Sequence, residues 1–138
     1  MSEQIQLLEG QRCRVVTFDV ETQEWIFNFA LGIVLRAGCP WRIITDGRIQ
    51  LGWRDHGQKF GLPSEVDGMR EAARLLGDSP VASAITAEKT ADLIITLESS
   101  ISLEVINDSS GYEGWTLYGP AGELFVAQGG GRLVTFRS

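Results

Sequence analysis

Short stretches in which apolar and polar residues alternate make up most of the chain. Residues 25–29, 48–53, 93–97 and 101–105 all follow this pattern. A period of two is typical of antiparallel strands that bury one face. The Asp46-Gly47 pair lies between two such runs and predicts a two-residue hairpin turn, because both turn positions need a positive φ. The sequence therefore predicts an α+β fold that is mostly antiparallel β.

One segment in the middle of the chain has helical spacing instead. After Pro63, Ser64 can cap a helix, with Asp67 three positions further on. The apolar residues that follow recur at three- and four-residue intervals up to Leu76, and Gly77 then ends the pattern. We expect one amphipathic helix over about residues 65–76.

The order of features before this helix resembles the order after it. The run at 25–29 matches the run at 93–97, Trp41 matches Trp115, and residues 47–49 match residues 122–124. Gly10 and Gly77 also match, at an offset of 67, and the offset then rises along the chain to 75 and never falls. This drift predicts a single domain, residues 1–138, made of two pseudo-repeats at about 10–62 and 77–138. The helix joins the two related β-meanders, and both tryptophans are expected in the core.

Composition narrows the functional classes. The 138 residues are 43% hydrophobic, enough for one domain with its own core, and the formal net charge is −6. Negative charge argues against a nucleic-acid partner. No apolar run is long enough to span a membrane and residues 1–6 do not resemble an export signal, so we expect a cytoplasmic protein. Cys13 and Cys39 are then expected as reduced thiols outside any metal-ligand spacing, and no metal or other cofactor is expected.

His56, the only histidine, follows Asp55 in the stretch GWRDHGQKFG. An enzymatic interpretation makes His56 a general base oriented by Asp55, with Glu113 as a further carboxylate. Neighbouring residues of a strand point to opposite faces, however, and no nucleophile occurs in a recognisable motif. We therefore expect a hydrogen-bonded structural corner, and a small hydrolase-like enzyme is the second interpretation of this motif.

The second pseudo-repeat is longer than the first around residues 107–114, where it is polar and rich in glycine. Such loops on a rigid β scaffold often carry binding residues. From residue 90 to residue 131 there is no lysine or arginine, whereas six carboxylates occur. A field of one sign steers an oppositely charged partner, and an exposed aromatic is a favoured interface anchor. The candidate contact residues for a basic protein partner are Glu104, Asp108, Ser109, Ser110, Tyr112 and Glu113.

Four motifs together resemble a family of small bacterial proteins of uncharacterised function. They are CPWR at 39–42, DHGQ with FGLP at 55–63, SSGYEGW at 109–115 and GGGRL at 129–133. The resemblance covers nearly the whole chain and implies no catalytic residue.

Small acidic proteins without a recognisable active site also include many immunity proteins of bacterial toxin systems. The sequence therefore favours a non-enzymatic protein-binding module, most specifically an immunity-type protein that neutralises a basic toxin. It is also compatible with a small-molecule binder between the meanders, and with a homodimer that pairs exposed strand edges.

Overall fold

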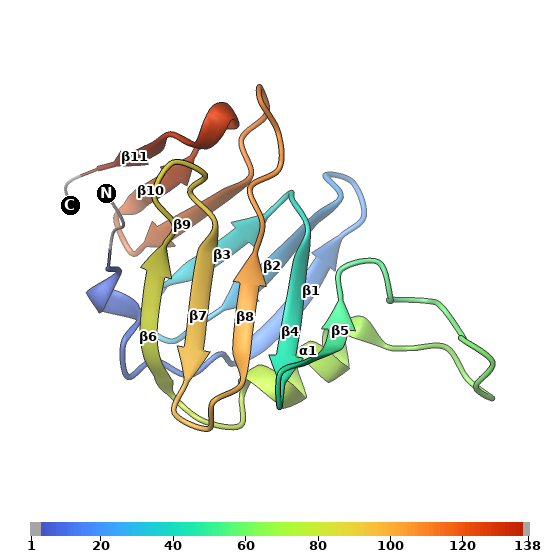
Figure 1. The fold of residues 1–138 in the computed structure, drawn as a ribbon. Helices are drawn as coiled ribbons and strands as arrows, with labels where there is room; N and C mark the ends of the chain where they lie inside the picture. Colours follow the sequence, from blue (N-terminus) through green and yellow to red (C-terminus); the bar gives the residue numbers. More distant parts are fainter. Residues whose placement is uncertain (1–3, 137–138) are drawn as a thin grey trace.

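The computed structural model describes residues 4–136, which form two antiparallel sheets, one α-helix and two short 3₁₀ helices (Figure 1). The elements are η1 (Gln6–Leu8), β1 (Val15–Asp19), β2 (Glu24–Asn28), β3 (Val34–Ala37), β4 (Trp41–Thr45), β5 (Arg48–Gly52), α1 (Gly68–Leu76), β6 (Val81–Thr86), β7 (Leu93–Leu97), β8 (Ser102–Val105), β9 (Trp115–Gly119), β10 (Gly122–Ala127), η2 (Gly129–Gly131) and β11 (Leu133–Thr135). The prediction of a mostly antiparallel β fold with one α-helix is confirmed. No helix within the described range is long and apolar enough to cross a membrane.

Each sheet contains strands from both halves of the chain. The six-stranded sheet has the order β1-β2-β3-β9-β10-β11, and the five-stranded sheet has the order β5-β4-β8-β7-β6. The meander β1-β2-β3 thus pairs with the later hairpin β9-β10 through the β3–β9 contact. In the same way, the meander β6-β7-β8 pairs with the earlier hairpin β4-β5 through β8 and β4.

Strand registers are equivalent in the two meanders. Phe27 pairs with Leu35 between β2 and β3, and Ile95 pairs with Leu103 between β7 and β8, at a constant offset of 68. The offset of 68 also relates the β1–β2 pairs to most of the β6–β7 pairs. The two meanders are therefore built on the same pattern of hydrogen bonds.

The two hairpins are also equivalent, at an offset of 74. Ile43 pairs with Leu51 and Leu117 pairs with Phe125, and a bulge interrupts each hairpin at the next position. The offset is thus 74, and not the 75 expected from matching residues 47–49 to residues 122–124. The predicted Asp46-Gly47 turn is present, with φ values of 51° and 75°.

These registers support an internal duplication, which stays a proposal about the origin of the chain. They also show a feature that the sequence did not indicate. Each repeat sends its hairpin into the sheet that holds the meander of the other repeat. The link after each meander, residues 38–40 in the first half and 106–114 in the second, crosses from one sheet to the other.

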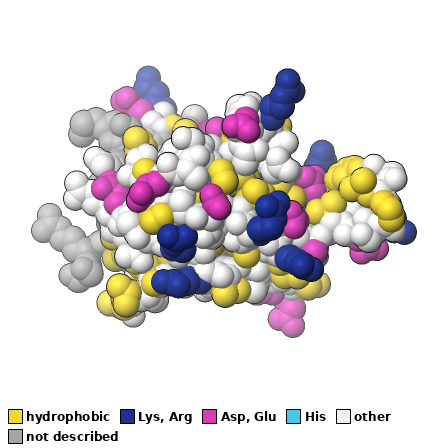
Figure 2. Space-filling model, turned by 90° about the horizontal axis from the view of Figure 1, so that it is seen from below, with side chains coloured by type: hydrophobic (Ala, Val, Ile, Leu, Met, Phe, Trp, Pro, Cys, Tyr) yellow, Lys and Arg dark blue, Asp and Glu magenta, His cyan; other side chains and the backbone are white. Residues whose placement is uncertain are grey.

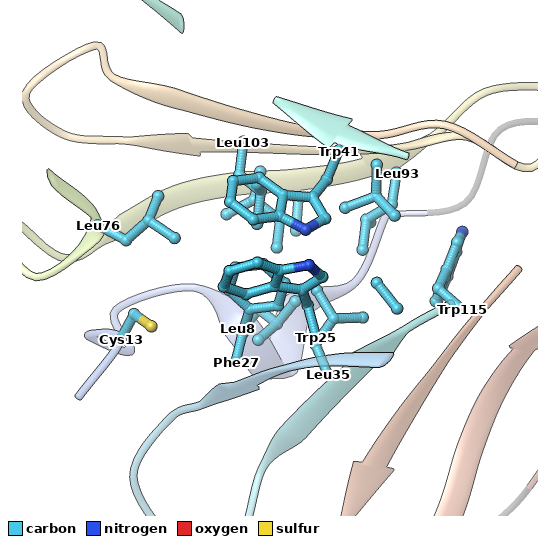
Figure 3. Packing of buried hydrophobic residues seen from close by; sticks show 14 of the residues in the cluster. Leu8, Cys13, Trp25, Phe27, Leu35, Trp41, Leu76, Leu93, Leu103 and Trp115 are labelled. Carbon is cyan, nitrogen blue, oxygen red and sulfur yellow. The ribbon is translucent and has the colours of Figure 1, made fainter. Parts of the chain in front are cut away.

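The core lies between the inner faces of the two sheets. Trp41 and Trp115 are both buried, as predicted. The ring of Trp41, on the five-stranded sheet, meets Trp25 at 5.0 Å and Phe27 at 5.3 Å between centroids, both on the six-stranded sheet (Figure 3). Ring planes at 78° and 87° are the edge-to-face arrangement that aromatic quadrupoles favour. These contacts hold the sheets together.

The helix begins later than the sequence suggests. Asp67, and not Ser64, is the N-cap of α1, and its carboxylate accepts the Arg70 N–H at 3.1 Å. The residues before Asp67 are held by the preceding loop, because the Val66 N–H donates to the Gln58 carbonyl. The helix contacts β1 and β5, the edge strands on one side of the sandwich.

The segment between β5 and α1 projects from the body of the molecule at the right of Figure 1. Phe60 and Leu62 in this segment are 68% and 58% exposed. Seen from below, hydrophobic side chains gather on this lobe, whereas charged side chains of both signs are spread over the rest of that face (Figure 2).

Equivalent core positions should contribute alike to stability. Leu35 and Leu103 are buried at matching places in β3 and β8. We expect Leu35→Ala and Leu103→Ala each to lower the free energy of unfolding by about 2–5 kcal/mol, as cavities in a packed core do. Urea denaturation measures this, with Leu62→Ala as the exposed control. A full loss in one variant and none in the other would contradict the energetic equivalence of the two sheets.

Candidate functional site

The DHGQ motif forms a corner in which both polar side chains bind backbone groups. Asp55 accepts the Gly52 N–H at 2.8 Å and thereby closes the turn that follows β5. His56 accepts the Gly68 N–H at 2.9 Å through Nδ1, so its proton resides on Nε2. The histidine thus ties the projecting segment to the first turn of α1.

The hydrolase-like interpretation requires a hydrogen bond from His56 to Asp55, and this corner has a different arrangement. Within residues 4–136, neither Asp55 nor Glu113 forms a hydrogen bond or ion pair with His56. Glu113 lies on the exposed loop before β9. In the same range, no three His, Cys, Asp or Glu side chains form a cluster that could hold a metal ion.

A cavity of about 300 Å³ opens beside His56. Three aromatic side chains besides the imidazole line it, together with one amide and one guanidinium: Phe18, Gln23, Trp25, Trp53 and Arg54. The ring of Trp25 stands at 88° to that of His56, with centroids 5.7 Å apart. Sequence reasoning missed this cavity, because its walls come from β1, β2 and the turn after β5. The sequence feature that could have indicated it is the Trp53-Arg54 pair, an aromatic and a cation directly before DHGQ.

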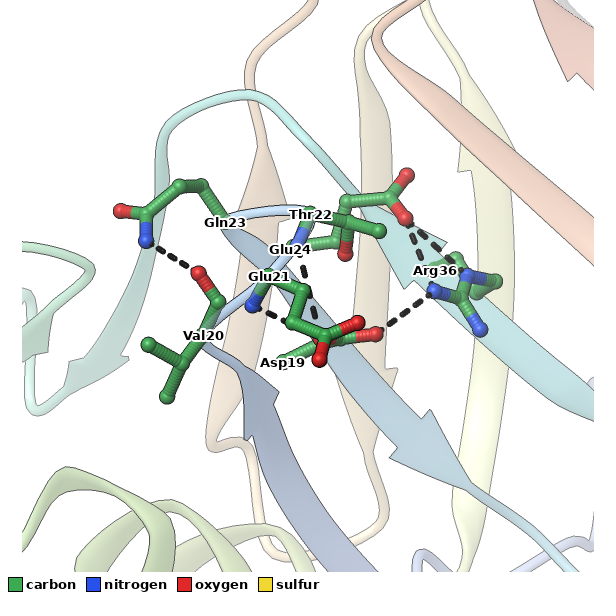
Figure 4. A network of polar contacts seen from close by, with 7 residues as sticks. All are labelled: Asp19, Val20, Glu21, Thr22, Gln23, Glu24 and Arg36. Atoms are coloured by element: carbon green, nitrogen blue, oxygen red, sulfur yellow. Dashed lines mark hydrogen bonds and ion pairs between the residues drawn. The ribbon is translucent and has the colours of Figure 1, made fainter.

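A polar network fixes the β1–β2 turn that carries part of this wall (Figure 4). Arg36 donates to Glu24 at 2.8 Å and lies 3.5 Å from Asp19. The Thr22 N–H, followed by the Glu21 N–H and the Arg36 charge, holds the pKa of Asp19 below its ordinary value. At the tip of the turn, the Gln23 amide donates to the Val20 carbonyl.

The loop at residues 107–114, which we call the 107–114 loop, is held in one conformation by internal and neighbouring contacts. Ser109 Oγ accepts the N–H groups of Gly111 and Tyr112 at 3.1 and 2.9 Å. The Gly111 backbone packs so closely on Gly129 that a Cβ at Gly129 would collide with it. Tyr112 is nevertheless 83% exposed.

Asn107 joins this loop to two others. Its side-chain amide donates to the Thr90 carbonyl at 2.9 Å and to the Gln128 carbonyl at 3.0 Å. Its backbone N–H donates to Asp92 at 2.8 Å. A Cβ at Gly114 would collide with the Asn107 side chain. Close packing between loops thus explains Gly114 of SSGYEGW and Gly129 and Gly131 of GGGRL.

The predicted contact residues do not form one group. Asp108, Ser109, Ser110, Tyr112 and Glu113 share the 107–114 loop. Glu104 lies apart from them on the outer face of β8, where its carboxylate pairs with Arg42 on β4 at 2.6 Å. Glu104 is therefore a weaker candidate for attracting a basic partner than the loop carboxylates.

Neither cysteine has the properties of a nucleophile. Both are free and buried. Burial raises the pKa of each thiol to about 12, and for Cys39 the charges of Asp108 and Asp92 add to the effect. A thiol with so high a pKa carries almost no thiolate at neutral pH, and the thiolate is the reactive form.

A larger groove, of about 680 Å³, lies between the projecting segment and α1. Its walls include Phe60, Leu62 and Leu75, and charged groups of both signs. Arg74 in this groove pairs with Glu71 at 2.8 Å. The groove is lined by four carboxylates and two guanidinium groups, and this mixture of charges favours no particular class of ligand.

These features describe a β-sandwich that displays a rigid loop with an exposed tyrosine, and a small aromatic cavity beside a histidine corner. The chain belongs to the DUF6188 family, a family of unknown function whose sequence model matches residues 8–137. No curated protein and no solved structure matches it.

The histidine corner should contribute to stability. In His56→Ala the Gly68 N–H loses its acceptor, and we expect the free energy of unfolding to fall by about 1–3 kcal/mol. In His56→Asn, the amide oxygen can take the place of Nδ1 and should restore part of the loss. Thermal unfolding followed by circular dichroism measures both variants. A His56→Ala protein as stable as the wild type would show that this bond is not structural.

The buried thiols predict a loss of stability at alkaline pH. Unfolding exposes thiols with a pKa near the ordinary value of 9.0, whereas the folded values are about 12. The unfolded state therefore releases protons first, and stability falls as pH rises from about 9 towards 12. We expect the Cys13→Ala/Cys39→Ala double variant to show a shallower fall in urea denaturation between pH 8 and pH 10.5. Parallel pH profiles for the two proteins would contradict the raised pKa values.

Proposed function

We propose that this chain is a non-enzymatic protein-binding module whose contact surface centres on the 107–114 loop. In its most specific form, it is an immunity-type protein that acts in the cytoplasm and occludes a basic toxin. The observation that carries the proposal is an exposed tyrosine on a loop whose backbone is already fixed.

The fixed backbone supports this proposal energetically. Association costs free energy whenever a loop must be ordered, so a loop already held by Ser109, Asn107 and close glycine packing loses less on binding. An aromatic side chain near the centre of an interface is a frequent hot spot. Tyr112 therefore has the exposure and the support expected of an anchor.

Charge supports a basic partner. Asp108 and Glu113 flank Tyr112, and the surrounding segment from residue 90 to residue 131 contains no lysine or arginine. Complementary charge mainly speeds association and excludes wrong partners. An acidic loop around an aromatic anchor suits a toxin surface that is itself basic.

The outer face of the five-stranded sheet gives a second candidate, contact with another copy of this chain. Ile85 and Ile94 pair across β6 and β7 on this face and are 44% and 41% exposed. Ile49, on the edge strand β5, is also exposed. The adjacent Ile85 and Ile94 provide the apolar contact that a second copy would cover.

The test uses the product of a neighbouring toxin gene as the partner. We expect Tyr112→Ala to weaken binding by about 2 kcal/mol, as removal of a hot-spot side chain does. The Asp108→Lys/Glu113→Lys variant should slow association by about tenfold and reduce its dependence on salt. Surface plasmon resonance at two salt concentrations measures both effects.

Glu98→Lys/Glu123→Lys is the matched control, because it changes the net charge by the same amount at two exposed carboxylates of the same segment outside the loop. An equal loss of association rate in this control would mean that net charge, and not the loop, controls binding. No binding by the wild-type chain would reject the immunity assignment. A dimer in light scattering that Ile94→Lys converts to a monomer would place the contact on the five-stranded sheet.

A further inference from the structure

We propose that the aromatic cavity beside His56 is a binding site for a small carboxylate with a flat apolar body. This site is separate from the 107–114 loop and its test is independent of the function proposed above. At about 300 Å³ the cavity lies at the lower end of the range for small-molecule sites. It has room for one ring with a short substituent.

The walls favour a flat apolar group. Phe18 and Trp25 lie 5.0 Å apart between ring centroids, and the imidazole of His56 stands edge-on to Trp25. Trp53 adds a fourth ring that is 42% exposed. Because Phe18, Trp25 and His56 pack directly on one another, a ligand ring would lie against the surface that they form, beside Trp53.

The polar groups of the cavity favour a negative charge on that ligand. No aspartate or glutamate lines it. Arg54 forms no ion pair with any residue in 4–136, and His56 Nε2–H has no acceptor in that range. A guanidinium and a neutral N–H are both donors, and a carboxylate can accept from both. The lining thus offers two donors and no carboxylate that would compete with the ligand for them.

The second half of the chain shows why this cavity exists. The link between meander and hairpin follows Ala37 in the first half and Val105 in the second, at an offset of 68. It ends at Trp41 in the first half and at Trp115 in the second, at an offset of 74. The second link is therefore six residues longer. In the second half, Asn107 in that longer link closes the end of the sandwich by binding the Thr90 and Gln128 carbonyls. The first half has only the short link at residues 38–40, and the corresponding end stays open.

The indole N–H groups of the two equivalent tryptophans also differ between the halves. Trp115 Nε1 donates to the Ala91 carbonyl at 2.8 Å, whereas the equivalent Trp41 Nε1 is buried and has no hydrogen-bond partner among residues 4–136. Figure 3 shows the Trp41 nitrogen on the side of its ring that faces Trp25, the buried wall of the cavity. The Trp41 N–H therefore lacks the acceptor that satisfies the N–H of its counterpart, Trp115.

Benzoate is a suitable probe, with benzamide as its neutral analogue and benzylamine as its cationic analogue. In ¹⁵N-labelled protein, the four tryptophan indole N–H signals report separately on the two cavity residues and on Trp41 and Trp115. We expect benzoate to shift the Trp25 and Trp53 signals saturably and to leave the Trp115 signal in place. Benzamide should bind about tenfold more weakly, since its neutral carbonyl accepts a hydrogen bond from Arg54 but forms no ion pair with it. Benzylamine should bind at least as weakly as benzamide, since its ammonium group has no acceptor and repels the guanidinium.

Two variants test the role of the charge. Arg54→Gln should weaken benzoate binding by about tenfold, whereas Arg48→Gln, an exposed arginine on β5 outside the cavity, should not change it. The same spectra show that each variant is folded. The proposal is overturned if no saturable shift occurs, if benzylamine binds as tightly as benzoate, or if Arg54→Gln binds as the wild type does.

Discussion

The whole structure depends on the exchange of hairpins between the two sheets. Trp41 belongs to the first half of the chain and packs on Trp25 and Phe27 of the same half, yet its strand hydrogen-bonds to β8 of the second half. The corresponding strand β9 pairs with β3 in return. Each half therefore supplies the other with the strand that completes its sheet, and neither half has a closed core alone.

The two halves have nearly the same strand arrangement, and both candidate sites lie where the halves differ. The longer link of the second half forms an exposed loop that Asn107 fixes. Its side-chain amide donates to the Thr90 and Gln128 carbonyls, and its backbone N–H donates to the Asp92 carboxylate. The shorter link of the first half leaves a cavity lined by aromatic rings. Trp25 pairs with Ala37, and Ala37 pairs with Trp115, across the six-stranded sheet. Trp25 lines the cavity and Trp115 directly follows the loop, so the cavity and the loop lie at the same end of the sandwich.

Polar groups in this protein stabilise local geometry more than they prepare chemistry. Asp55, His56 and Ser109 each bind a backbone N–H, and the thiols are buried in their neutral form. Exposed pairs such as Arg42 with Glu104 contribute little to stability, because water and salt screen them. The remaining exposed aromatic and charged groups, such as Tyr112 and Arg54, are the ones free to meet a ligand or partner.

The sequence by itself determined the strands, the Asp46-Gly47 turn, the burial of Trp41 and Trp115 and the extra length at residues 107–114, because alternation, turn chemistry and length are local properties. It did not determine the helix start, since bonds between Val66 and the preceding loop override the capping signal of Ser64. Only the tertiary structure decided which hairpin joins which sheet. It also decided which end of the sandwich stays open, because a cavity whose walls come from three separate segments exists only after those segments have packed.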